Sequence, residues 1–143
     1  TTGSVIPFWL SQKEKEQSLK LTDKNMNRLM FSQKSAVNLI NDTINYCEAN
    51  GGGFVSSTFM KSVNMYTLAQ TISDNIEIVG LRPGERLNEK LISQKELPFT
   101  YLEDNLIILK KDFNSGSNKL SEEYSSLTAE KMSSDDMLEL IDE

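Results

Sequence analysis

The sequence predicts an α/β fold, because stretches with helical periodicity alternate with strand-like stretches along its 143 residues. The clearest helical stretch is 32–49, where apolar residues recur every three or four positions. The clearest strand-like stretches are 76–81 and 106–110, which are short apolar runs beside turn-forming residues. Because these strands are too few for a full doubly wound sheet, we expect one domain that carries only part of such a sheet.

Composition excludes several classes of function. The formal net charge is −6, whereas binding to nucleic acid or to an anionic membrane needs a basic surface. The apolar runs are far shorter than the roughly 18 residues needed to span a bilayer. We therefore expect no nucleic acid and no membrane as partner, and a cytoplasmic location. The chain has no histidine, which excludes a His-based triad or a His metal site within it.

The first third of the chain predicts a helix, a strand and a second helix. Residues 4–17 favour a short helix whose apolar head, 5–10, is too crowded to face one way, so some of it should meet a second surface or a ligand. For Phe8 and Trp9 we expect core packing. Residues 19–22 alternate like a strand and run into a turn at 23–25.

The helix 32–49, capped by Ser32, has an apolar stripe that we expect to face the core. The stripe consists of Val37, Ile40, Ile44 and Cys47. We expect the single cysteine to be a buried structural thiol. Gly51–Gly53 follow the C-terminal end of this helix, so they favour a helix stop over a phosphate cradle, which precedes a helix.

The middle of the chain predicts a turn at 60–63 and then a helix with Asn64 or Ser62 as its cap. Its methionines favour gap filling in a core over metal binding. A buried strand at 76–81, a turn and a short helix at 87–91 follow.

The last third predicts a hairpin, a polar segment and a helix. Residues 99–103 and 106–110 flank Asp104 and Asn105, which tolerate the backbone conformation of a tight turn. Residues 114–124 favour an extended or flexible segment, and 134–141 favour a terminal helix that docks or serves as a regulated tail.

The turn at Pro83 and Gly84 carries the strongest candidate binding residues. Pro fixes one backbone angle and Gly permits a positive φ, so the chain reverses just after the strand. Ligand sites gather at such strand ends in α/β proteins. The Arg82 guanidinium suits a phosphate, and the Glu85 carboxylate suits a pair of ribose hydroxyls. Alternatively, these two side chains only pair with each other across an exposed turn.

Three segments, in order, resemble a known family. Residues 82–91 match Arg-Pro-Gly-Glu-Arg-Leu-x-Glu-x-Leu, and residues 3–8 match Gly-Ser-Val-Ile-Pro-x-Phe. Residues 21–30 resemble Ile-Thr-Asp-x-x-Met-Thr-Arg-Phe, with Asn27 at the position of the Thr before Arg. These motifs resemble bacterial nucleotide-sugar 4,6-dehydratases and epimerases of the polysaccharide-biosynthesis type, in the extended short-chain dehydrogenase/reductase superfamily. The resemblance extends to about residue 113.

The resemblance implies the C-terminal substrate-binding part of an extended Rossmann-type dehydratase/epimerase, with the Rossmann half largely absent. Residues 1–113 would be the nucleotide-sugar-binding portion, and 114–143 a tail with an extended segment and a terminal helix. Because Thr1 lies inside a recognisable motif, we expect a fragment of a longer polypeptide or an excised domain.

The resemblance also implies a binding site for UDP. Arg28 and Arg82 would contact the phosphates, and Glu85 the ribose. Four residues would lie beside the uracil: Val5, Pro7, Leu21 and Thr22. NAD or NADP would bind in the complete enzyme through a Gly-x-x-Gly-x-x-Gly loop, with a Tyr-x-x-x-Lys pair as acid/base. Neither motif occurs here, so we expect this chain alone to bind no cofactor, to hold no catalytic residue and to be inactive.

The expected function is to hold the UDP part of a UDP-N-acetylglucosamine 4,6-dehydratase, in some members also 5-epimerising, for surface polysaccharide biosynthesis. In the family, hydride leaves C4 for NAD(P), water leaves across C5 and C6, and hydride returns to C6. The expected partners are a UDP-sugar and the missing N-terminal Rossmann half, with a homo-oligomer left open. The alternatives are a non-catalytic interaction or nucleotide-sugar-binding domain, and an incomplete reading frame without its own function.

Overall fold

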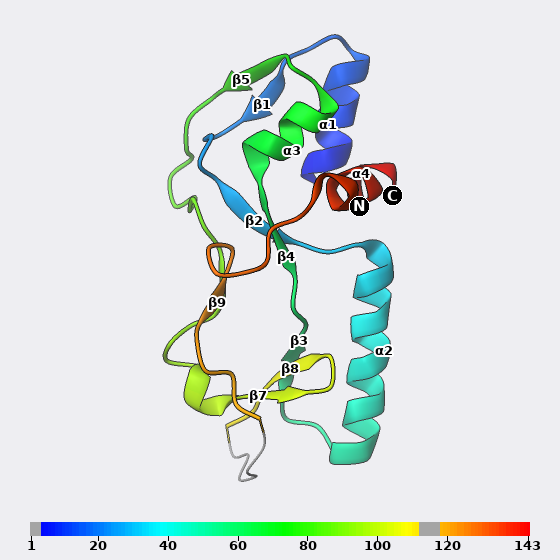
Figure 1. The fold of residues 1–143 in the computed structure, drawn as a ribbon, viewed down its shortest axis with the longest axis vertical. Coiled ribbons are helices and arrows are strands. Elements are labelled where there is room, and N and C mark those ends of the chain that lie inside the picture. The colour runs from blue at the N-terminus through cyan, green and yellow to red at the C-terminus, as the bar shows by residue number, and fades with distance from the viewer. Residues whose placement is uncertain (1–3, 112–117) are drawn as a thin grey trace.

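The structure is a computed structural model that describes residues 4–111 and 118–143. The molecule is elongated, with a helical end and a β-rich end joined by a pair of short antiparallel strands (Figure 1). Within the described residues the strands form four small sheets, so the fold is mixed α/β as predicted, without one continuous sheet. No helix in these residues is long and apolar enough to cross a membrane.

The helical end holds the main hydrophobic core. There β1 (Leu19–Leu21) pairs in parallel with β5 (Ile76–Ile78). Three helices gather beside this pair: α1 (Val5–Glu14), α3 (Met65–Ile72) and α4 (Ser134–Asp142) (Figure 1). The most deeply buried core side chains are Trp9, Leu19, Leu21, Val63, Leu68 and Ala69. The core therefore packs helices against one parallel strand pair.

The centre of the molecule is an antiparallel pair of strands. β2 (Asn27–Met30) pairs with β4 (Lys61–Asn64), with Arg28 opposite Val63. The turn predicted at 60–63 is therefore wrong. The local sequence could not reveal β4, because the strand that pairs with it lies 31 to 37 positions earlier in the chain.

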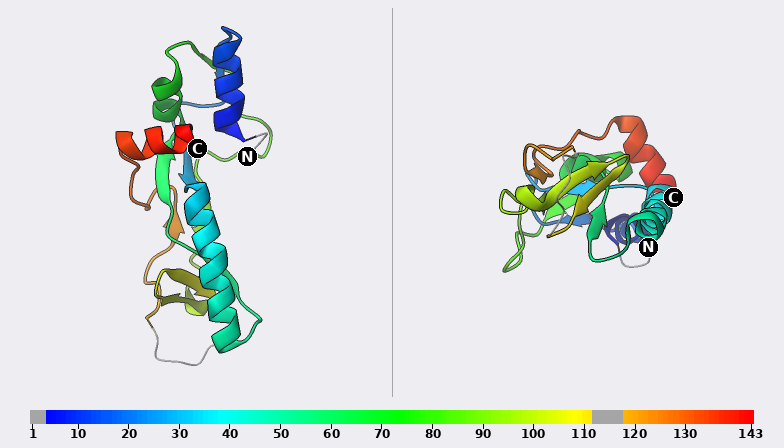
Figure 2. Two further views of the ribbon diagram at one scale, coloured as in Figure 1. Left: turned by 90° about the vertical axis from the view of Figure 1, so that its right-hand side faces the viewer. Right: turned by 90° about the horizontal axis from the view of Figure 1, so that it is seen from below.

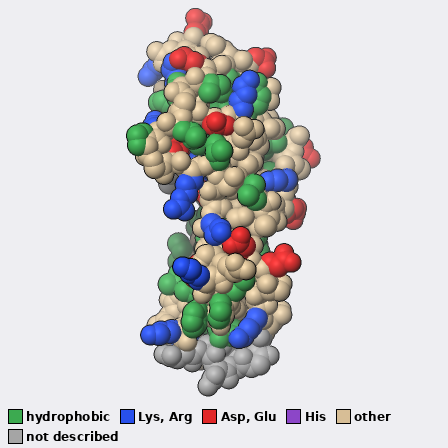
Figure 3. Space-filling model, turned by 90° about the vertical axis from the view of Figure 1, so that its left-hand side faces the viewer, with side chains coloured by type: hydrophobic (Ala, Val, Ile, Leu, Met, Phe, Trp, Pro, Cys, Tyr) green, Lys and Arg blue, Asp and Glu red, His purple; other side chains and the backbone are tan. Residues whose placement is uncertain are grey.

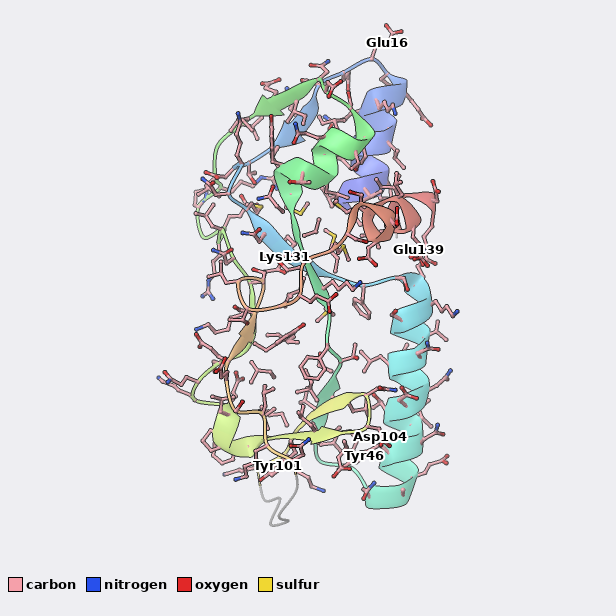
Figure 4. The ribbon with its side chains drawn as sticks, viewed as in Figure 1. Glu16, Tyr46, Tyr101, Asp104, Lys131 and Glu139 are labelled. Carbon is pink, nitrogen blue, oxygen red and sulfur yellow. The ribbon has the colours of Figure 1, made fainter. Side chains whose placement is uncertain are left out.

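The β-rich end is an antiparallel sheet of three strands in the order β3 (Val55–Ser57), β8 (Leu106–Leu109) and β7 (Thr100–Glu103). A short 3-10 helix, η1 (Leu97–Phe99), comes directly before β7. The predicted hairpin is confirmed, and Asp104 has a φ of 49° in its turn (Figure 4).

The short helix predicted at 87–91 is wrong. Residues Lys90–Ile92 form β6, which pairs with β9 (Tyr124–Ser125). Two leucines four positions apart suggested a helix, but pairing with a distant strand decided the conformation.

The helix α2 (Gln33–Asn50) forms as predicted, but its stripe does not face the core. Ser32 caps it by accepting a hydrogen bond from the Ser35 N–H, and Gly51, with a φ of 74°, ends it. Val37, Ile40 and Ile44 are 55%, 58% and 51% exposed, and Cys47 is exposed too. Figure 2 shows α2 running along the outside of the molecule. Periodicity shows that a helix has an apolar face, but not what covers it.

The strand predicted at 76–81 is shorter and less buried than expected. β5 ends at Ile78, which is 44% exposed, and Val79 and Leu81 are 48% and 45% exposed. β1 is its only partner within the described residues, so its other edge lacks a neighbouring strand.

Other local predictions are confirmed. Asn64 caps α3 by accepting from the Thr67 N–H, and the terminal helix forms as α4. A capping box of Ser133 and Asp136, which was not predicted, begins α4. Trp9 is buried as expected, whereas Phe8 is 50% exposed, so the prediction of core packing is wrong for Phe8. Part of the polar segment 114–124 lies outside the described residues.

Candidate functional site

One pocket of about 520 Å³ brings together six of the seven residues expected to bind UDP. It lies between α1, β1, β2 and the loop after β5. The six are Val5, Leu21, Thr22, Arg28, Arg82 and Glu85. Pro7 lines instead a neighbouring apolar groove next to α2 and α4, to which Val5 also contributes. Positions two apart on a helix point in nearly opposite directions, so Val5 reaches the first pocket and Pro7 does not.

The loop after β5 holds Arg82 and Glu85 on a tight turn. The Glu85 N–H donates to the Arg82 carbonyl at 3.0 Å, and Gly84 has a φ of 81°, the geometry of a type II turn. The Glu85 carboxylate also accepts from the Arg82 N–H at 3.1 Å. These bonds fix the carboxylate toward the pocket without using the Arg82 guanidinium.

Glu85 does not pair with the side chain of Arg82 in the described residues. Its Oε1 lies 3.9 Å from the guanidinium of Arg28, on β2. The simple alternative of an Arg82–Glu85 ion pair across the turn is therefore not what forms. Instead Glu85, on the turn, faces Arg28 of β2 across the pocket.

Arg28 is the most constrained charged group of the pocket, with a side chain only 17% exposed. One terminal nitrogen donates to the carbonyls of Asn27 and Leu87 at 3.0 and 3.3 Å. Its Nε lies 3.3 Å from Glu89 Oε1. A guanidinium has five N–H donors, so the other terminal nitrogen, with only the long contact to Glu85, retains capacity to bind an anion.

The pocket carries three cationic side chains from three segments. Arg82 is exposed and has no ion pair within residues 4–111 and 118–143. Lys20 on β1 pairs with Glu77, and this hydrogen bond lowers the pKa of the Glu77 carboxyl below its usual value. Figure 3 shows Lys and Arg side chains along the face that carries β5, with acidic ones between them. Two guanidiniums beside a fixed carboxylate can bind a diphosphate next to a diol.

Several residues that line the pocket were not predicted from the sequence, and two of them, Phe8 and Glu89, have chemistry that suits a ligand site. The crowded apolar head of the first helix was the signal for Phe8, whose half-exposed ring offers an aromatic face to the pocket. Glu89 belongs to the same motif as Arg82 and Glu85, and only its contact with Arg28 reveals its place.

The glycine run Gly51–Gly53 does not have the position of a pyrophosphate-binding loop. Gly51–Gly53 follow the C-terminal end of α2 and lead into β3. A pyrophosphate cradle precedes a helix N-terminus, where backbone N–H groups point at the phosphates. This run therefore has the wrong orientation for NAD or NADP.

Comparisons with known proteins agree with the sequence motifs. A family model described as "Polysaccharide biosynthesis protein" matches residues 1–111. A UDP-N-acetylglucosamine 4,6-dehydratase (inverting) of Campylobacter jejuni strain 81-176 is 32% identical over 108 residues, which cover 72% of this chain and 31% of the relative. A UDP-glucose 4-epimerase of Rickettsia bellii is 29% identical over 99 residues, covering 66% of this chain and 29% of the relative. The chain thus spans about a third of the length of these relatives.

A solved structure also matches the fold. The X-ray structure of Pen from Bacillus thuringiensis has a TM-score of 0.79 at 24% identity, and the match covers 99% of this chain and 44% of that one. The fold described here therefore corresponds to a part of the Pen chain.

Proposed function

Because this chain belongs to the polysaccharide biosynthesis protein family, we propose that its pocket binds the UDP part of a nucleotide sugar. The enzyme would be a nucleotide-sugar dehydratase or epimerase, and most specifically a UDP-N-acetylglucosamine 4,6-dehydratase of surface polysaccharide biosynthesis. The two named relatives differ in reaction but share a UDP-linked sugar. The observation that carries the proposal is the meeting of Arg28, Arg82 and Glu85 in one pocket.

The proposed roles follow from the geometry. Arg28 and Arg82 approach from β2 and from the loop after β5, so together they contact a diphosphate from two sides. Glu85, held on its turn, accepts hydrogen bonds from the ribose hydroxyls. Phe8 supplies an aromatic face near Val5, Leu21 and Thr22, where the base would lie.

The chain contributes binding energy and orientation to the reaction. Contacts to the UDP group hold the sugar in place while its bonds change elsewhere, which is how remote parts of a substrate assist catalysis. In this proposal, NAD or NADP and the acid/base residues belong to a part of the enzyme outside this chain, and the chain alone is inactive.

The same proposal assigns a partner to the bare stripe on α2. Val37, Ile40 and Ile44 expose a continuous apolar line, and β5 has an edge without a partner strand in the described residues. An unpaired strand edge exposes N–H and C=O groups that can pair with a further strand. Since the chain covers only 44% of Pen, we assign these surfaces to the cofactor-binding half of the enzyme.

Replacing Ile40 and Ile44 by Glu tests this assignment. The variant should unfold at the same temperature as the unchanged chain, because both side chains are already exposed, and should bind less of a hydrophobic dye. If sedimentation equilibrium shows that the unchanged chain is a dimer and the variant a monomer, the stripe binds a second copy of the chain instead.

Calorimetric titration with UDP-N-acetylglucosamine tests the proposed function, with UMP as the control for the second phosphate. Saturable binding that is much weaker for UMP is the expected result. A chain that unfolds cooperatively and binds neither ligand would favour a non-catalytic interaction domain.

A further inference from the structure

Glu89 uses both carboxylate oxygens to contact β2. Its Oε1 lies 3.3 Å from Arg28 Nε, and its Oε2 accepts the Leu29 N–H at 3.1 Å. Two residues earlier, the Leu87 carbonyl accepts the Asn27 N–H at 2.8 Å. The segment 87–89 thus follows the edge of β2 that faces away from β4, and it reaches Arg28 from that edge.

The main chain of Glu89 is itself held by the C-terminal part of the molecule. Its N–H donates to Ser126 Oγ at 2.9 Å, and its carbonyl accepts the Ser126 N–H at 2.9 Å. Ser126 is fully buried, and its carbonyl accepts from Ser62 Oγ at 2.5 Å and from Lys131 Nζ at 3.0 Å. Figure 4 shows Lys131 where the chain after β9 passes β4.

These contacts form a connected path from the tail to the pocket. Ser126 lies outside residues 1–111, the part of the chain that matches the family model. Ser126 is hydrogen-bonded both to Ser62 on β4 and to the main chain of Glu89. The Glu89 carboxylate in turn contacts Arg28 at the edge of β2. An arginine whose Nε is fixed cannot rotate its planar group freely, so its remaining donors keep one direction.

We propose that Glu89 is the positioning residue of Arg28, and that Ser126 acts on the pocket through Glu89. The consequence for UDP rests on the proposed function, whereas the orientation of Arg28 does not. Glu89 is 46% exposed, so the contact is partly screened and its loss should weaken UDP binding about two- to fivefold.

Glu89→Gln isolates the ion pair from the rest of the contact. The amide oxygen still accepts the Leu29 N–H, while the amide lacks the charge that holds Arg28 Nε. The variant should keep the thermal unfolding of the unchanged chain, weaken UDP binding about two- to fivefold, and speed the exchange of the Arg28 Nε–H with water measured by NMR. Glu123→Gln is the control, because Glu123 pairs with Lys90 at 2.7 Å and does not line the pocket.

Ser126→Ala tests the remote step. It should also weaken UDP binding and speed exchange at Arg28, and adding it to Glu89→Gln should weaken binding no further, because the two act in one path. Thr128→Val is the control, since Thr128 bonds to Ser125 and Glu123 within the same turn of the tail. Additive effects would overturn the role of Ser126.

The exchange measurement separates this proposal from the proposed function. If the folded chain binds no UDP, the proposed function is wrong. The exchange rate of the Arg28 Nε–H would still test whether Glu89 positions Arg28. Unchanged exchange in a folded Glu89→Gln variant would overturn that role.

Discussion

Replacing Arg82 with Ala tests the proposed diphosphate contact with little damage to the fold. Arg82 is exposed, and its guanidinium has no ion pair in the described residues. Its N–H, which donates to the Glu85 carboxylate at 3.1 Å, remains in the variant. The free energy of unfolding should therefore change by less than about 0.5 kcal/mol.

The expected loss of binding follows from the chemistry of the contact. Hydrogen bonds to charged groups contribute about 1.5 to 3 kcal/mol, or roughly ten- to hundredfold in the dissociation constant. Because Arg82 is exposed, water screens its contact, and we expect a value near the lower end of this range. The loss should be larger for UDP than for UMP, which lacks the second phosphate.

Isothermal titration of the unchanged chain and of Arg82→Ala measures this difference. Arg86→Ala is the matched control, because Arg86 is an exposed arginine of the same motif that does not line the pocket. A dissociation constant for UDP within about twofold of the unchanged chain, well below the expected loss, would remove Arg82 from the site. An equal loss in Arg86→Ala would show that general charge, and not this contact, attracts the ligand.

Three further predictions concern the ribose contact, the turn and the tail. Glu85→Ala should abolish the preference for UDP over its 2'-deoxy analogue, measured by calorimetry, and a preference that survives would exclude the ribose role. Gly84→Ala should lower the free energy of unfolding in urea by about 1 kcal/mol or more, because Gly84 has a φ of 81°. The hydrogen bond from Lys61 lowers the pKa of Asp136 to about 2 from 3.8, so its contribution to stability is present above about pH 4 and is lost as the pH falls through about 2. Asp136→Asn should therefore melt below the unchanged chain at neutral pH and approach it near pH 2, and a pH-independent difference would contradict this reasoning.

The predictions that the structure confirms depend on neighbours in sequence. Ser32 and Asn64 each cap a helix by accepting from an N–H three residues later. The turn at Pro83 and Gly84 and the hairpin at Asp104 follow from the backbone angles those residues allow. Such features need no knowledge of the rest of the fold.

Tertiary structure alone decided the elements whose partners are distant. β4 and β6 are strands because β2 and β9 lie beside them, and no local pattern distinguished them from a turn and a helix. The same limit applies to burial. Periodicity predicted an apolar face on α2, but its exposure depends on which surface packs against it.

The candidate site divides in the same way. The sequence by itself indicated Arg82 and Glu85 as candidates for a phosphate and a ribose contact, because charge and turn geometry are local properties. Arg28 entered through the family resemblance. Only the tertiary structure showed that these three side chains share a pocket, that Pro7 lies outside it, and that Glu89 contacts Arg28. Those facts depend on how β2 and the loop after β5 pack together. The two segments are more than fifty positions apart, and the sequence of neither one alone shows that they are in contact.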